Sequence, residues 1–115
     1  MPRSPKAYLA DIVDACRRVA TFISGVDLPG YLDSEEKRSA VERQLLIIGE
    51  AVAALRRVSP EIAESISEAR LIVGFRNVLV HDYASVVDEL VYAMAVDEAP
   101  KLLLECEQLL ARSAD

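Results

Sequence analysis

The chain has 115 residues, of which 52% are hydrophobic and only 5% aromatic, and its formal net charge is −6. These values fit one domain with a packed core over residues 1–115, exclude a disordered chain and argue against an all-β sandwich. The acidity argues against a surface that binds phosphate backbones throughout. However, residues 84–115 hold seven acidic and two basic residues, so a local nucleic-acid site elsewhere is still allowed.

The first two predicted helices occupy the N-terminal half of the chain. One begins after Ser4, the expected N-cap, and its apolar residues recur at helical spacing until Gly25. Residues 27–30 are expected to form a loop. A second amphipathic helix follows, with Asp33 as its expected N-cap, and runs to about residue 58.

Two further helical stretches complete the pattern. One begins at Pro60 and runs toward His81, with a break expected near Ser67. The other begins at Ser85, and we expect Pro100 to kink or divide it. The sequence thus predicts an all-α fold, an antiparallel bundle of four to five helices joined by short loops.

The second helix has two unusual features. Gly49 lies inside it, where glycine costs about 1 kcal/mol relative to alanine, and either a close helix crossing or chance would explain it. Its apolar face, like that of the C-terminal helix, is broader than a small core needs. We therefore predict a two-fold dimer that buries apolar surface.

The cysteines and the charge pattern limit the environment of the protein. Cys16 and Cys106 lie in apolar helical contexts with no CxxC motif, so we expect buried, reduced thiols and no structural zinc. Asp11 and Asp14 interrupt the first apolar run, and no stretch is long enough to cross a membrane. We expect a soluble, cytoplasmic protein that needs no metal or cofactor.

One segment carries most of the chemically active side chains. Between residues 74 and 83, the otherwise apolar sequence contains Arg76, Asn77, His81, Asp82 and Tyr83, and His81 is the single histidine of the chain. If the helix continued to Tyr83, Arg76 and Tyr83 would share one stripe, and Asn77 and His81 another. Asn77 would then orient the imidazole or contact a ligand.

These residue types suit one reaction in particular. The guanidinium of arginine fits a phosphate, and histidine exchanges protons near neutral pH. Together they suit cleavage of RNA by its own 2′-hydroxyl, without a metal. The residue types alone favour a simpler interpretation, a polar network that only closes the end of a helix.

A family resemblance bears on this choice. The pattern Arg-x4-His-x-Tyr, within Phe-Arg-Asn-x-Leu-Val-His-Asp-Tyr, resembles the signature of the HepT-like toxins of the HEPN superfamily. Residues 41–51, with their Ile-Gly-Glu-Ala run, resemble the second helix of that family, and residues 60–62 resemble the start of its third. Many relatives carry a tryptophan on each side of the motif, where this chain has Ile66 and Tyr92.

The resemblance implies a homodimeric helical bundle with the motifs at the cleft between subunits. It implies metal-independent cleavage of an RNA substrate through Arg76 and His81, supported by Asn77 and Asp82. It also implies a cognate antitoxin, a minimal nucleotidyltransferase, which in some members transfers AMP to the motif tyrosine, here Tyr83. The alternatives are a non-catalytic dimeric partner or substrate of that nucleotidyltransferase, and a helical dimer with no chemistry.

Other charged residues allow two interpretations. Arg56 and Arg57, with Arg38 and Arg43 upstream, either extend a phosphate-binding surface or form an ordinary solvated helix face. Glu50, in the Ile-Gly-Glu-Ala run, either pairs with an arginine at a dimer cleft or is exposed.

Overall fold

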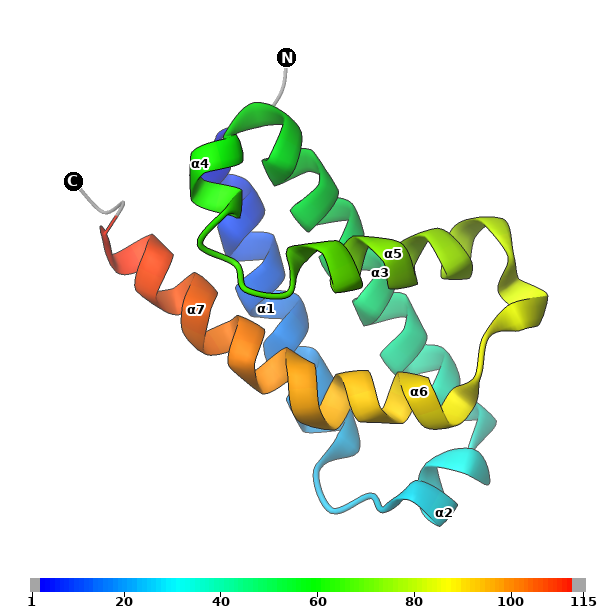
Figure 1. Ribbon diagram of the computed structural model, residues 1–115. Coiled ribbons are helices and arrows are strands. Elements are labelled where there is room, and N and C mark those ends of the chain that lie inside the picture. The colour runs from blue at the N-terminus through cyan, green and yellow to red at the C-terminus, as the bar shows by residue number, and fades with distance from the viewer. Residues whose placement is uncertain (1–2, 113–115) are drawn as a thin grey trace.

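The computed structural model describes residues 3–112, and none of these residues lies in a strand (Figure 1). The predicted all-α fold is confirmed. In chain order the elements are the helices α1 (Pro5–Ile23), α2 (Leu28–Leu32), α3 (Glu35–Val58), α4 (Pro60–Ala63) and α5 (Ala69–His81), the 3₁₀ turn η1 (Tyr83–Ser85), the helix α6 (Asp88–Ala93), the π-helical segment η2 (Met94–Glu98) and the helix α7 (Ala99–Arg112).

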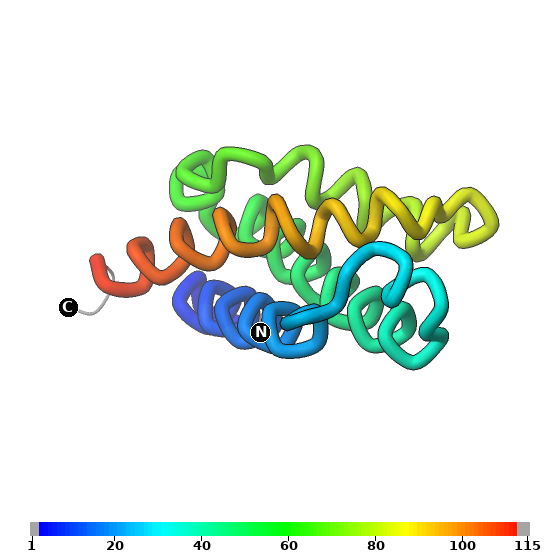
Figure 2. Tube along the Cα trace, turned by 90° about the horizontal axis from the view of Figure 1, so that it is seen from below, coloured from blue at the N-terminus to red at the C-terminus, as the bar shows by residue number. Residues whose placement is uncertain are grey.

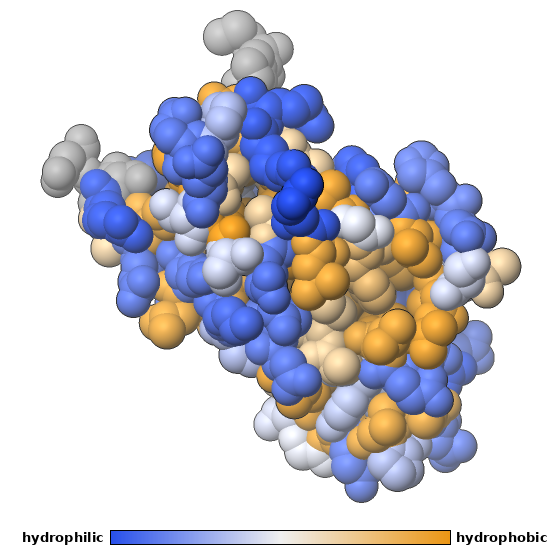
Figure 3. Space-filling model, in the orientation of Figure 1, coloured by the Kyte–Doolittle hydropathy of each residue, from blue (hydrophilic) through white to orange (hydrophobic). Residues whose placement is uncertain are grey.

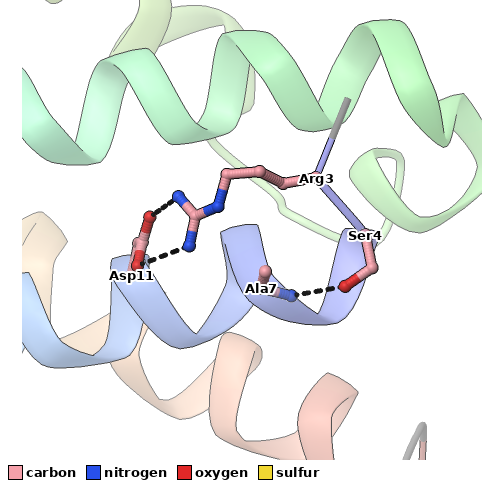
Figure 4. A network of polar contacts seen from close by, with 4 residues as sticks. All are labelled: Arg3, Ser4, Ala7 and Asp11. Atoms are coloured by element: carbon pink, nitrogen blue, oxygen red, sulfur yellow. Dashed lines mark hydrogen bonds and ion pairs between the residues drawn. The ribbon is translucent and has the colours of Figure 1, made fainter. Parts of the chain in front are cut away.

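The start of α1 is capped as predicted (Figure 4). The hydroxyl oxygen of Ser4 accepts a hydrogen bond from the backbone N–H of Ala7, 3.2 Å away. The guanidinium of Arg3 pairs with the carboxylate of Asp11 two turns further along the helix. A side-chain acceptor at this position satisfies one of the N–H groups that begin a helix without a partner.

The connection between α1 and α3 differs from the prediction in two respects. Residues 27–30 are not a plain loop, because α2 begins there, with the carboxylate of Asp27 accepting from the N–H of Gly30 at 2.9 Å. The N-cap of α3 is Ser34 and not Asp33. Asp33 closes α2 with helical backbone angles, whereas Ser34 is extended and accepts from the N–H of Lys37 at 3.1 Å.

The central element of the bundle is α3. It packs on α1 along one side and on α5 along another, so that α5 and α1 lie far apart in the turned view (Figure 2). α7 packs against α1. The largest fully buried side chains come mainly from α1 and α3: Leu9, Ile12, Val19, Val41, Ile48, Val52 and Leu55. The broad apolar face predicted for the second helix is therefore covered within one chain.

The C-terminal helical run changes geometry one turn before Pro100. The backbone N–H of Ala99 donates to the carbonyl of Met94, five residues back, which defines the π-helical segment η2. Proline lacks an N–H, and its ring collides with the carbonyl four residues earlier in a regular α-helix. The wider π turn relieves that conflict, so the run from Asp88 to Arg112 continues past Pro100.

The predicted break near Ser67 separates α4 from α5, whose main packing partner is α3. Figure 3 shows hydrophobic side chains gathered over α5 and α6 on the face turned toward the viewer. The large apolar residues exposed along these elements are Leu71 and Val80 in α5, Leu90 in α6 and Val87, the N-cap of α6. Other large apolar residues are exposed elsewhere, among them Val58 at the end of α3, Val96 in η2 and Leu104 in α7. α3 therefore contributes little exposed apolar surface, whereas α5, α6 and the C-terminal helix contribute most of it.

The cysteines are buried and unbridged. Cys16 in α1 and Cys106 in α7 are free thiols, and burial raises the pKa of each to about 12. No helix within residues 3–112 has the length and apolar character needed to cross a membrane.

Candidate functional site

The motif residues lie along α5 and just beyond its end. Arg76, Asn77 and His81 belong to the helix, Asp82 follows it and Tyr83 begins η1. The helix ends at His81, where the sequence predicted it to end, so Tyr83 does not continue the helical stripe of Arg76. Asp82 leaves the helical conformation, with φ −149° and ψ 54°, and its carboxylate accepts a 2.7 Å hydrogen bond from the hydroxyl of Ser85.

Gly49 allows α5 to approach α3 at the position of Arg76. A Cβ atom placed on Gly49 would lie 2.3 Å from the Cβ of Arg76 and 2.8 Å from its Cγ. Carbon atoms in contact are normally about 3.5–4.0 Å apart. The close helix crossing, rather than chance, therefore explains this glycine, and the crossing places the stem of Arg76 directly against α3.

The guanidinium of Arg76 is held from two sides. Its Nε donates to Oε1 of Glu50 at 2.7 Å, and its Nη2 donates to Oε2 of the same carboxylate at 3.3 Å. Its Nη1 donates to Oδ1 of Asn77 at 2.6 Å. Because each terminal nitrogen carries two N–H groups, these bonds leave one N–H on each for a further acceptor.

This arrangement answers two questions that the sequence left open. Glu50 pairs with an arginine of its own chain. The amide oxygen of Asn77 binds Arg76, so the hydrogen bond of Asn77 supports the guanidinium and not the imidazole.

Tyr83 is exposed, with 61% of its surface accessible, yet its phenol has a defined partner. The hydroxyl donates to Oε1 of Glu42 in α3 at 2.7 Å. This bond raises the pKa of Tyr83, because ionisation would remove the donor and place a phenolate beside a carboxylate. Tyr83 and Glu42 line a polar hollow of about 290 Å³, together with Arg38 and Asp88.

His81, the last residue of α5, is exposed. Within residues 3–112 its side chain has no hydrogen bond or ion pair, in contrast to Arg76 and Tyr83. Five helical residues separate His81 from Arg76, which corresponds to about 140° around the helix and about 7.5 Å along it. The two side chains thus leave the C-terminal half of α5 in different directions.

Glu42 is the part of the site that the sequence did not reveal, whereas for Glu50 a pair with an arginine was one of two alternatives. Glu42 and Glu50 are eight residues apart, so they share one face of α3, and they bind the tyrosine and the arginine of the motif respectively. Their spacing was the available signal, but a charged helix residue is usually just solvated.

Of the four arginines singled out on the second predicted helix, only Arg38 lies near a motif residue, in the hollow that Tyr83 lines. Arg38 donates to the carbonyl of Leu32 and lies 3.8 Å from Asp88, while Arg43, Arg56 and Arg57 are exposed on α3. Within the described chain, no group of three or more His, Cys, Asp or Glu side chains is placed to hold a metal ion.

The fold and the site define a helical domain with a braced arginine and an exposed histidine in the C-terminal half of one helix. The family model described as "Ribonuclease HepT-like" matches residues 12–109. The chain therefore belongs to the HepT-like ribonuclease family.

Curated relatives agree with this assignment. The chain is 31% identical to "Putative RNase MJ1380" of Methanocaldococcus jannaschii, over 91% of this chain and 95% of that protein. It is 30% identical to "Probable ribonuclease HepT" of Thermococcus cleftensis, over 95% of this chain and 98% of that protein. No solved structure gives a significant match.

Proposed function

We propose that this protein is a metal-independent endoribonuclease and the toxin of a toxin–antitoxin pair. Family membership supports the class of reaction. The observation that carries the site assignment is the presence of a braced guanidinium, with two N–H groups to spare, and an exposed imidazole in the C-terminal half of one helix.

In the proposed reaction, the 2′-hydroxyl of a ribose attacks the adjacent phosphorus. A base removes the 2′-proton, the bond from phosphorus to the 5′-oxygen breaks, and an acid protonates that leaving oxygen. His81 serves as base or acid. Arg76 stabilises the negative charge that develops on the phosphoryl oxygens. The products are a 2′,3′-cyclic phosphate and a free 5′-hydroxyl.

RNA cleavage by the purified chain tests these assignments. Arg76→Ala and His81→Ala are each expected to lower kcat at least a hundredfold. Arg57→Ala, a matched loss of charge at an exposed position outside the site, is expected to stay within threefold of the wild type. Retained cleavage in both site variants, with the fold verified by circular dichroism, would refute the assignment.

A homodimer forms part of the proposal, because Arg76 and His81 diverge from one helix. A cleft between two copies supplies two of each to one scissile phosphate. The exposed apolar residues of α5 and α6 support this, since they flank the motif along the chain and are about half exposed. Sedimentation of a monomer at micromolar concentration would contradict the dimer.

Subunit exchange tests whether the cleft is shared. Arg76→Ala and His81→Ala chains, each inactive alone, would form a heterodimer that retains one intact residue of each kind. Regained cleavage on mixing supports a site built from both subunits. If both imidazoles are required, with one as base and the other as acid, the mixture stays inactive.

We further propose that a minimal nucleotidyltransferase neutralises the toxin and transfers AMP to Tyr83. The exposure of the phenol makes it accessible to such an enzyme. A phosphodiester at that position would add charge and volume close to the motif. Mass spectrometry after incubation with the partner and ATP is expected to show added AMP, and AMP addition that survives in Tyr83→Phe would refute this site.

A further inference from the structure

We propose that Glu50 is a positioning residue for RNA cleavage, which it supports by fixing the guanidinium of Arg76. This inference rests on the proposed ribonuclease function. The observation that supports it is a two-point contact: the carboxylate of Glu50 accepts hydrogen bonds from Nε and Nη2 of Arg76, at 2.7 and 3.3 Å. A carboxylate that binds this edge of a guanidinium fixes its plane as well as its location.

The surrounding contacts strengthen this function of Glu50. Gly49, the preceding residue, lets the stem of Arg76 lie against α3, so the arginine reaches the carboxylate over a short path. Asn77 holds the third nitrogen. The side chain of Arg76 is only 20% exposed, and the long flexible stem of an arginine in water would not otherwise hold one orientation.

Glu50 leaves the arginine competent for a phosphate. Of the five N–H groups of the guanidinium, two are donated to Glu50 and one to Asn77, and the remaining two are on the terminal nitrogens. The side chain of Glu50 is 53% exposed, so the carboxylate is a bracing group at the margin of the site. A preorganised donor stabilises a transition state better than a donor that must first be ordered.

Steady-state cleavage of a defined RNA tests the inference. Glu50→Gln keeps the size of the side chain but replaces one acceptor oxygen with a donor amide, which opposes the guanidinium. We expect kcat to fall about a hundredfold, with KM changed less than threefold. Glu36→Gln, at another exposed position on α3, is the matched control and is expected to leave both constants within twofold. An unchanged or raised kcat in Glu50→Gln, or an equal fall in the control, would overturn the inference.

Two measurements separate positioning from general destabilisation. If Glu50 acts through Arg76, Glu50→Gln costs less than threefold in an Arg76→Lys background, because a lysine cannot use the two-point contact. The NMR signal of the Arg76 Nε–H is expected to shift and to exchange faster with water in Glu50→Gln, with or without RNA. If the falls in kcat caused by Glu50→Gln and Arg76→Lys simply multiply in the double variant, or if the Nε–H signal of Arg76 is unchanged, the inference is overturned.

The failure of the parent proposal is distinguishable. A wild-type chain that cleaves no RNA would remove the ribonuclease function, and this inference with it. Wild-type cleavage that Glu50→Gln leaves intact would overturn the inference alone.

Discussion

Replacement of Gly49 by alanine should destabilise the protein, although alanine is the better helix former. The exchange gains about 1 kcal/mol of helix propensity in the interior of α3. Against this, the new methyl group would lie 2.3 Å from the Cβ of Arg76, so α3 and α5 must separate by about 1 Å to restore normal contact. Overpacking of this kind costs about 1–3 kcal/mol, and more where the obstructing atom is close to the backbone. We expect a net loss of about 1–2 kcal/mol in the free energy of unfolding.

Urea denaturation at fixed protein concentration measures this change, and Gly74→Ala provides the control. A Cβ on Gly74, which also lies in a helix, would have no neighbour within 4 Å. That variant should therefore gain stability, by up to about 1 kcal/mol. The separation of the helices in Gly49→Ala should also weaken the pair of Arg76 with Glu50 and slow RNA cleavage. A Gly49→Ala variant as stable as Gly74→Ala would refute the close-contact reasoning.

Three further predictions concern tyrosines and cysteines. Glu42→Gln should lower the pKa of Tyr83, which a titration monitored by ultraviolet absorbance measures. In the wild type the hydrogen bond raises this pKa, so its contribution to stability is lost as the pH rises above about 10. Tyr31→Phe should leave the free energy of unfolding unchanged or raise it by up to about 1 kcal/mol, because the buried hydroxyl has no hydrogen-bond partner within residues 3–112. A clearly lower free energy of unfolding in urea denaturation would contradict this. Cys16 and Cys106, with pKa values of about 12, should react with iodoacetamide at pH 8 only after unfolding; rapid labelling of the folded chain would contradict their burial.

The sequence predicted the long helices well because their signals are local. Ser4 could be identified as an N-cap, and apolar periodicity located the helices on both sides of residues 27–30. Asp33 was misplaced because both it and Ser34 are good caps, and the choice depends on α2, a short helix with little periodicity of its own. Pro100 signalled a disturbance, but whether a helix kinks, divides or widens depends on its packing.

The motif was visible in the sequence, but its surroundings were not. Arg76, His81 and Tyr83 could be singled out from residue types and resemblance, and the helix end near His81 was predicted, but the turn at Asp82 that takes Tyr83 off the helix was not. The pairing of Glu50 with Arg76 spans 26 residues, and no local rule predicts it. The exposed face of α5 likewise became evident only once α3 was seen to be covered by α1 and α5.

The chemical ends of the RNA products test the central claim most directly. We predict that the purified protein cleaves RNA in the presence of excess EDTA and leaves a 2′,3′-cyclic phosphate on one product and a 5′-hydroxyl on the other, and that His81→Ala abolishes both. Cleavage that stops in EDTA, or products that end in a 3′-hydroxyl, would contradict a mechanism in which Arg76 and His81 act on the phosphate without a metal.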